Sequence, residues 1–100
     1  MSRIRYERRD DGQVVAWVFS QADRVLLRRS AELMAQDLGA EACERFDGGD
    51  QVFWDFTWMG TELTLTLDRR RGLAVHASGS SAEAEALTRR VAEHLEARLG

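Results

Sequence analysis

The segment from Val52 to Leu67 most constrains the fold, because apolar residues alternate with polar ones on both sides of a turn. Alternation with a period of two predicts two half-buried strands. Met59 and Gly60 form a two-residue loop, which pairs Trp58 with Thr61. The pairs that follow outward are Phe56 with Leu63, Trp54 with Leu65, and Val52 with Leu67. All the large apolar side chains then share one face, and a shift of one residue would destroy this match.

The same parity extends to a third strand, which follows the turn from Asp68 to Gly72. Gly72 suits the positive-φ position that ends such a loop. The predicted pairs are Leu67 with Leu73, Leu65 with Val75, and Leu63 with Ala77. The opposite face then carries three rows across the strands: Thr57, Glu62 and Ser78; Asp55, Thr64 and His76; and Phe53, Thr66 and Ala74.

The first residues predict another hairpin, because Ile4 and Tyr6 alternate with charged residues before an Asp-Gly turn and an apolar run. We take Asp11 and Gly12 as its loop. This register predicts that Tyr6 pairs with Trp17, and Ile4 with Phe19, on the buried face. It also sends Val14, Ala16 and Val18 to the polar face, where arginine stems cover them. All three tryptophans, Trp17, Trp54 and Trp58, are then expected to point toward the core.

Two segments predict amphipathic helices. The first runs from Gln21 to Leu38, with Ser20 as its N-cap and Gly39 as its left-handed C-cap. The second begins at a capping box of Ser80 and Glu83 and runs to the C-terminus. Its apolar residues recur every four positions: Leu87, Val91, Leu95 and Leu99. Between the helices, Ala42–Phe46 predicts a short strand at a sheet edge, because its pairing turns Glu44 or Arg45 inward.

The predicted element order is therefore β-β-α-β-β-β-β-α. Two amphipathic helices and alternating strands favour a two-layer α+β sandwich. We expect a mostly antiparallel sheet of about five to six strands with both helices on one face. A chain of 100 residues, 44% of them hydrophobic, fits a single domain over residues 1–100.

Composition excludes several classes of function. The formal net charge of -3 gives no overall attraction to nucleic acid. The single Cys43 can form no internal disulfide, and no apolar run approaches a membrane span or the core of a signal peptide. We therefore expect a cytoplasmic protein. All 14 basic residues are arginine and asparagine is absent, a bias typical of GC-rich genomes, so we expect a bacterial source.

The polar sheet face is the candidate functional surface. It combines the apolar residues Phe53, Val14 and Val18 with threonine, alanine and acids, a mixture that suits docking of another protein surface. The predicted binding residues are Phe53, Asp55, Thr64, Thr66 and His76. We therefore expect a non-catalytic interaction module that binds a protein partner or a second copy of itself, through this face or an edge strand. No cofactor and no metal site are expected, and His94 is expected to be partly packed rather than a ligand.

Two other functions stay open at this stage. Local arginine clusters could contact nucleic acid, through Arg3, Arg5, Arg69, Arg70 and Arg71. A small hydrolase could use His76 and Ser78 with a nearby acid. However, two strand spacings of about 4.8 Å separate Asp55 from His76, which leaves a Ser-His-Asp triad unassembled.

Overall fold

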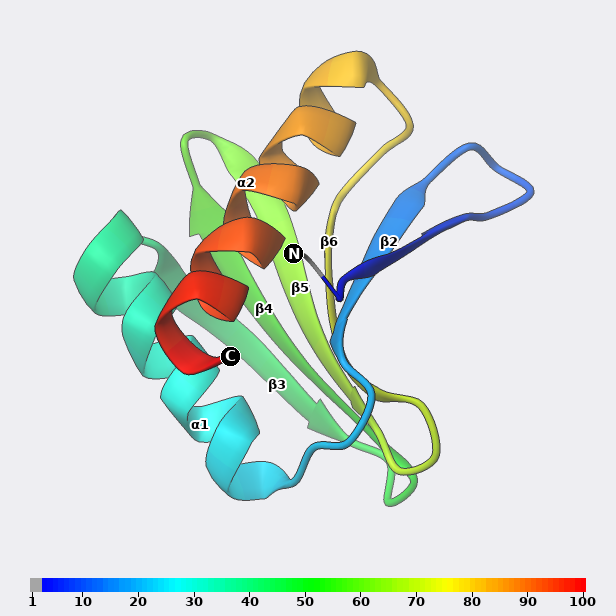
Figure 1. The fold of residues 1–100 in the computed structure, drawn as a ribbon. Helices are drawn as coiled ribbons and strands as arrows, with labels where there is room; N and C mark the ends of the chain where they lie inside the picture. The colour runs from blue at the N-terminus through cyan, green and yellow to red at the C-terminus, as the bar shows by residue number, and fades with distance from the viewer. Residues whose placement is uncertain (1–2) are drawn as a thin grey trace.

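A computed structural model describes residues 3–100. Its strands are β1 (Arg5–Arg8), β2 (Val14–Phe19), β3 (Glu41–Asp47), β4 (Gln51–Trp58), β5 (Thr61–Asp68) and β6 (Gly72–Ala77). Its helices are α1 (Arg24–Leu33), continued by the π-helical turn η1 (Met34–Leu38), and α2 (Ala82–Leu99). The strands form one antiparallel sheet in the order β1-β2-β6-β5-β4-β3. Both helices lie on the same side of it (Figure 1), so the predicted α+β sandwich is confirmed.

The central part of the sheet has the predicted register. In β4 and β5, Phe56 pairs with Leu63 and Trp54 with Leu65, and β6 continues the parity by pairing Val75 with Leu65. These residues form the core beneath the helices, together with Leu27 of α1 and with Val91 and Leu95 of α2. Gly72 has the expected positive φ of 101°, and a side chain there would clash with the carbonyl oxygen of Phe19.

The register of the first hairpin differs from the prediction by one residue. Arg5 pairs with Trp17, and Tyr6 pairs with Ala16. The reason is a longer loop. The amide of Arg9 donates to the carbonyl of Gln13, so three residues, 10–12, lie between this bonded pair. Gly12 takes a left-handed φ of 87°, which is typical of the bulge that closes a three-residue hairpin loop.

This shift moves the side chains of residues 14–18 to the opposite face from the predicted one, whereas a bulge after Trp17 keeps Phe19 on the helix side. Ala16 and Val18 belong to the core beneath the helices, and the parity of the strand places Val14 on the same side. Trp17 instead lies on the opposite face, in a small cluster with Val15 and Ala74. The predicted pairs of Tyr6 with Trp17 and of Ile4 with Phe19 are therefore wrong, as are the predicted faces of Val14, Ala16, Val18 and Trp17.

Both helices begin later than predicted. Asp23 caps α1 in place of Ser20, since its carboxylate accepts a hydrogen bond from the amide of Leu26 at 2.9 Å. Ser81 caps α2 in place of Ser80, accepting from the amide of Ala84. The predicted left-handed cap at Gly39 is confirmed. No helix within residues 3–100 is long and apolar enough to span a membrane.

The strand β3 lies at the sheet edge, as expected. A bulge interrupts its pairing with β4 between Ala42 and Arg45. Arg45 lies on the helix side, where its guanidinium stacks 4.2 Å from the ring centre of Trp54. The edge strand is therefore irregular and carries charges on both sides.

Candidate docking surface

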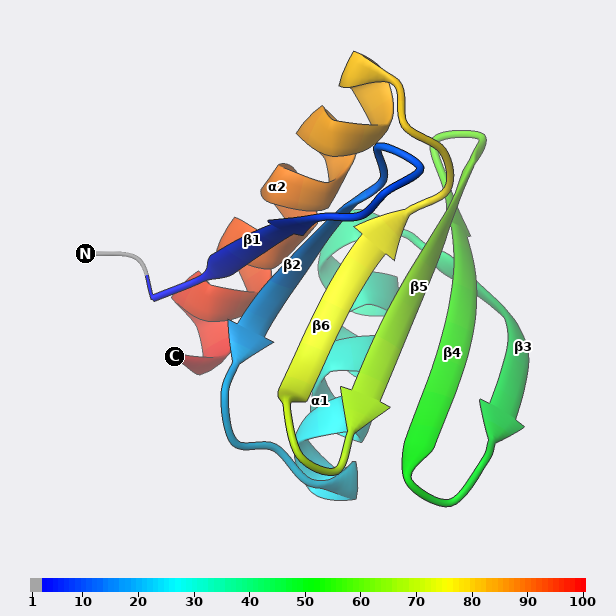
Figure 2. The same ribbon diagram turned by 90° about the vertical axis from the view of Figure 1, so that its right-hand side faces the viewer.

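One face of the sheet has no element of residues 3–100 over it. Figure 2 shows the sheet from this side, with both helices behind it. We call it the uncovered face. The paired registers bring one row of residues across all six strands, which we call the aromatic row: Arg5, Trp17, Ala74, Thr66, Phe53 and Phe46.

A pair of charged side chains, Arg71 and Glu7, covers the part of the aromatic row that lies on β2. Trp17 is only 5% exposed although no helix lies over it. The guanidinium of Arg71 stacks 4.2 Å from its ring centre, and Arg71 also donates to the carboxylate of Glu7 at 2.8 Å. This hydrogen bond is the main reason that the pKa of Glu7 is lowered. The stacked guanidinium of Arg71 thus shields the Trp17 ring from solvent on a face where no helix does so.

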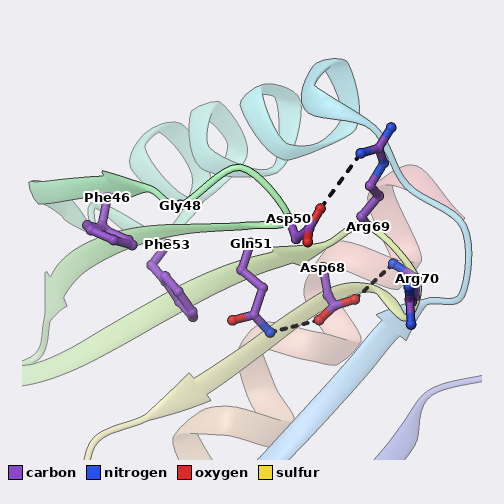
Figure 3. Close-up of a pocket in the computed structure, with 8 residues that line it drawn as sticks. All are labelled: Phe46, Gly48, Asp50, Gln51, Phe53, Asp68, Arg69 and Arg70. Atoms are coloured by element: carbon purple, nitrogen blue, oxygen red, sulfur yellow. Dashed lines mark hydrogen bonds and ion pairs between the residues drawn. The ribbon is translucent and has the colours of Figure 1, made fainter.

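The opposite end of the row is open. The rings of Phe46 and Phe53 lie 6.1 Å apart and tilted by 34°, and Phe46 is 63% exposed. They border a shallow cavity of about 590 Å³ (Figure 3). Among its lining residues, the side-chain amide of Gln51 donates to Asp68 at 2.8 Å, which is the main reason that the pKa of Asp68 is lowered. Aromatic surface is therefore accessible beside a hydrogen-bonded polar pair.

The second predicted row is also present. Thr64 pairs with both Asp55 and His76, and its hydroxyl donates to the Asp55 carboxylate at 2.8 Å. Burial lowers the pKa of His76, and the charge of Arg9 lowers it further. The Nδ1 atom of His76 is buried and has no hydrogen-bond partner within residues 3–100. A neutral imidazole separated from Asp55 by a whole strand gives no support to a catalytic triad.

The five predicted binding residues therefore share the uncovered face, although two of them contribute little surface. Thr64 and Thr66 are only 9% and 7% exposed, whereas Phe53, Asp55 and His76 are half-buried. The surface available to a partner lies mainly around the phenylalanines and the charged margins.

Three of the arginines proposed for nucleic acid, Arg69, Arg70 and Arg71, are consecutive in the β5–β6 turn. The backbone amide of Arg3 donates to Glu96 on α2. Arg69 lies 3.7 Å from Asp50 at the β5–β6 turn, and Arg70 lines the cavity beside Phe46. Arg5 and Arg71 both lie beside Trp17, as its strand partner and as its stacked cation. Carboxylates already pair with part of the set, since Arg69 lies near Asp50 and Arg71 binds Glu7.

Sequence reasoning missed two residues of the aromatic row. Alternation in the predicted register places Trp17 in the core and gives Phe46 no role. The signal for Trp17 is the run Asp10-Asp11-Gly12, which fits a three-residue loop as well as a two-residue loop. For Phe46 it was the parity that pairs it with Phe53.

Other candidate residues act within the fold. His94 is partly packed, as predicted, and its Nε2 lies 2.7 Å from a carboxylate oxygen of Asp37. Arg98 donates to the same oxygen, so two side chains of α2 bind Asp37 of η1. Within the part of the chain that the structure describes, no group of three His, Cys, Asp or Glu side chains could hold a metal ion.

No protein-family model matches the chain, and neither a curated protein nor a solved structure matches it.

Proposed function

We propose that this protein is a non-catalytic protein-binding module whose docking surface is the uncovered face of the sheet. The aromatic row carries the proposal, because it crosses all six strands on a face without a helix. Protein interfaces favour aromatic side chains and arginine at their centre and polar groups at their rim. The accessible end of the row supplies two such aromatic side chains, Phe46 and Phe53, and charged groups border them.

The two sheet edges are less suited to binding than the face. At one edge, β1 has only four residues, two of which are arginines. At the other edge, β3 is bulged between Ala42 and Arg45 and carries several charged residues. Short, bulged and charged edges discourage the addition of another strand. These features favour the face over edge pairing as the mode of contact.

The chemistry of the face also favours binding over catalysis. The hydroxyl of Thr64 donates a hydrogen bond to the carboxylate of Asp55, and burial disfavours the charged form of His76. A cytoplasmic location goes with the proposal, since the single cysteine can form no internal disulfide. The arginine-rich, asparagine-free composition favours a bacterial source.

Substitution at the open end of the row tests the proposal. Phe46→Arg and Phe53→Arg place a charge at the contact surface, while Ala86→Arg adds the same side chain to an exposed position of α2. Immobilised protein is used to capture binding proteins from a native lysate, with circular dichroism as a check of folding. We expect wild type and Ala86→Arg to capture the same proteins and both phenylalanine variants to lose them. Retention of every captured protein by both folded phenylalanine variants would overturn the proposal.

A further inference from the structure

We infer that the cavity beside Phe46 and Phe53 binds an extended segment of a partner protein that presents an aromatic side chain and, two residues away, a carboxylate. The inference rests on the proposed function and adds the chemistry of the partner. Three observations carry it: the exposed aromatic pair has a supported position, Arg70 lacks an ion-pair partner, and the acidic groups nearest to it already have partners.

The aromatic pair of Phe46 and Phe53 is accessible and supported from beneath. Phe46 is 63% exposed, and its ring lies 6.1 Å from that of Phe53. Gly48 allows this position, because a Cβ atom added there would lie 2.9 Å from Cε2 of Phe46. The amide of Gly48 also donates to the carbonyl of Gln51 at 2.8 Å, so the supporting loop is itself hydrogen-bonded. Two exposed rings in such a position suit the insertion of an aromatic side chain, since aromatic pairs attract one another in tilted or offset contacts.

Two connected loops form the cavity at this end of the sheet. The amide of Arg69 in the β5–β6 turn donates to the carbonyl of Asp50 in the β3–β4 loop at 2.9 Å. A second hydrogen bond joins the side chains of Gln51 and Asp68. Because an ionised carboxylate cannot donate, Nε2 of Gln51 faces Asp68, and Oε1 points toward Phe53 (Figure 3). This oxygen can accept a hydrogen bond from a backbone amide of the bound segment.

The unpaired charge at the cavity is positive. Of the three arginines in the β5–β6 turn, Arg69 pairs with Asp50 and Arg71 pairs with Glu7. Arg70 lines the cavity and is exposed, and its guanidinium has no ion-pair partner within residues 3–100. A guanidinium can bind a carboxylate through two parallel hydrogen bonds. An acidic side chain of the partner therefore complements this side of the cavity.

The acidic groups that line the cavity are already engaged. Asp68 accepts hydrogen bonds from two backbone amides of the turn and from the side chain of Gln51. Asp50 lies 3.7 Å from Arg69, and Figure 3 shows this pair turned away from the phenylalanines. The acids thus balance donors of the protein itself and leave Arg70 available to a partner.

The charges around the aromatic pair also give the bound segment a direction. Asp55 lies two residues from Phe53 on β4 and would repel a carboxylate at that side. Gln51 lies two residues from Phe53 on the other side, about 6.7 Å along the strand, and pairs with the residue before the turn. An extended chain spaces its own side chains i and i+2 by the same distance. One segment can therefore place a ring at the phenylalanines and a carboxylate toward Arg70.

These features favour a protein segment over single-stranded nucleic acid. Nucleic acid carries a row of phosphates and binds to grooves that offer several cations. Among the described residues that line the cavity, Arg70 alone is a cation without an ion-pair partner. The formal net charge of the chain is -3, which adds no general attraction for phosphate.

Short peptides test the chemistry of the partner. The probe is a blocked peptide, Gly-Glu-Gly-Phe-Gly-Glu-Gly, which carries a glutamate two positions from its ring in either chain direction. Matched peptides replace both glutamates by glutamine or by lysine, or the phenylalanine by alanine. Amide shifts of the isotope-labelled full chain give the dissociation constants, and we expect a value on the order of millimolar for the probe. The glutamine peptide should bind about two- to fivefold more weakly, the lysine peptide more weakly still, and the alanine peptide at least about threefold more weakly.

Variants of the chain separate the charge contact from the ring contact. Arg70→Glu should reverse the preference, so that the lysine peptide binds more tightly than the glutamate peptide. Phe53→Ala should weaken every peptide that contains the ring. Gly48→Ala moves the ring of Phe46 without removing it and should weaken these peptides less. Arg29→Glu, at an exposed position of α1, is the matched control and should bind all the peptides like wild type.

Three results would each overturn the inference: no shift of the cavity amides with the probe up to about 10 mM, equal binding of the glutamate and lysine peptides, or an unchanged preference in folded Arg70→Glu. Shifts of these amides by single-stranded oligothymidine in place of the peptides would assign the cavity to nucleic acid instead.

The proposed function is tested separately. If Phe46→Arg loses captured proteins while the glutamate and lysine peptides bind alike, the face binds a protein of different chemistry and only the inference fails. If the phenylalanine variants lose nothing, the proposed function fails as well.

Discussion

At the centre of the sheet, the two faces are buried to almost the same degree by different means. On β5, Leu65 points beneath the helices and is fully buried, while its neighbour Thr66 points to the uncovered face and is only 7% exposed. Helices exclude water from the first face. On the second, neighbouring side chains do so, above all Arg71 over Trp17. Low exposure of a residue therefore does not show that a helix covers its face. A face covered only by its own side chains can still bind a partner.

The largest expected difference between the faces is in stability. Leu65→Ala removes side-chain volume from the packed core and should cost about 2–5 kcal/mol of unfolding free energy. Thr66→Ala removes a smaller side chain from a face without a helix, and should cost about 1 kcal/mol or less. Urea unfolding of the two variants measures both values. Equal losses would show that the uncovered face is packed as tightly as the core.

A smaller effect is expected from removing the cation over Trp17. Arg71→Ala deletes both the stacked guanidinium and the partner of Glu7, and both charged side chains are partly exposed to solvent. We expect a loss of about 1 kcal/mol or less. In a Trp54→Phe, Trp58→Phe background, emission from Trp17 should shift to the red and become easier to quench. Arg70→Ala, at the next position of the same turn, should leave the emission unchanged; an identical shift would refute the role of Arg71.

The smallest effect is a pH dependence from the uncovered face. Burial lowers the pKa of His76 below its usual 6.5 in the folded protein. Above pH 6.5 the imidazole is mostly neutral in both states and stability is unaffected. As the pH falls through 6.5 toward the folded-state pKa, the unfolded chain binds the proton first, so folding loses stability, by at most about 1.4 kcal/mol per pH unit.

His76→Gln should flatten this part of the stability curve, measured by urea unfolding between about pH 7 and about pH 5. An unchanged slope would mean that other groups cause the pH dependence.

The sequence predicted the half of the sheet whose register is set locally. In β4, β5 and β6, only one pairing places every large apolar residue on one side. The positions of Phe56, Leu63 and Val75 therefore allow a single register. In the first hairpin, Asp11-Gly12 fits a loop of two or three residues. β2 is apolar on both faces, so its pattern could not decide between them. An error of one residue in the loop then misplaced Trp17.

The residues of the candidate site could be predicted where they lie on β4 and β5, but not where they lie on β2. Phe53, Thr64 and Thr66 follow from the β4–β5 hairpin alone, and their predicted positions are confirmed. The pairing of Trp17 with Ala74 and its contact with Arg71 join residues far apart in the sequence. Alternation along a strand carries no information about which distant strand lies beside it.

The most direct test of the uncovered face as a contact surface is the change in backbone amide chemical shifts when a captured protein is added to the isotope-labelled chain. Our account predicts changes at Phe46, Phe53 and Asp55, and none on the outer surface of α2. Changes confined to the helices, with the uncovered face unaffected, would contradict it.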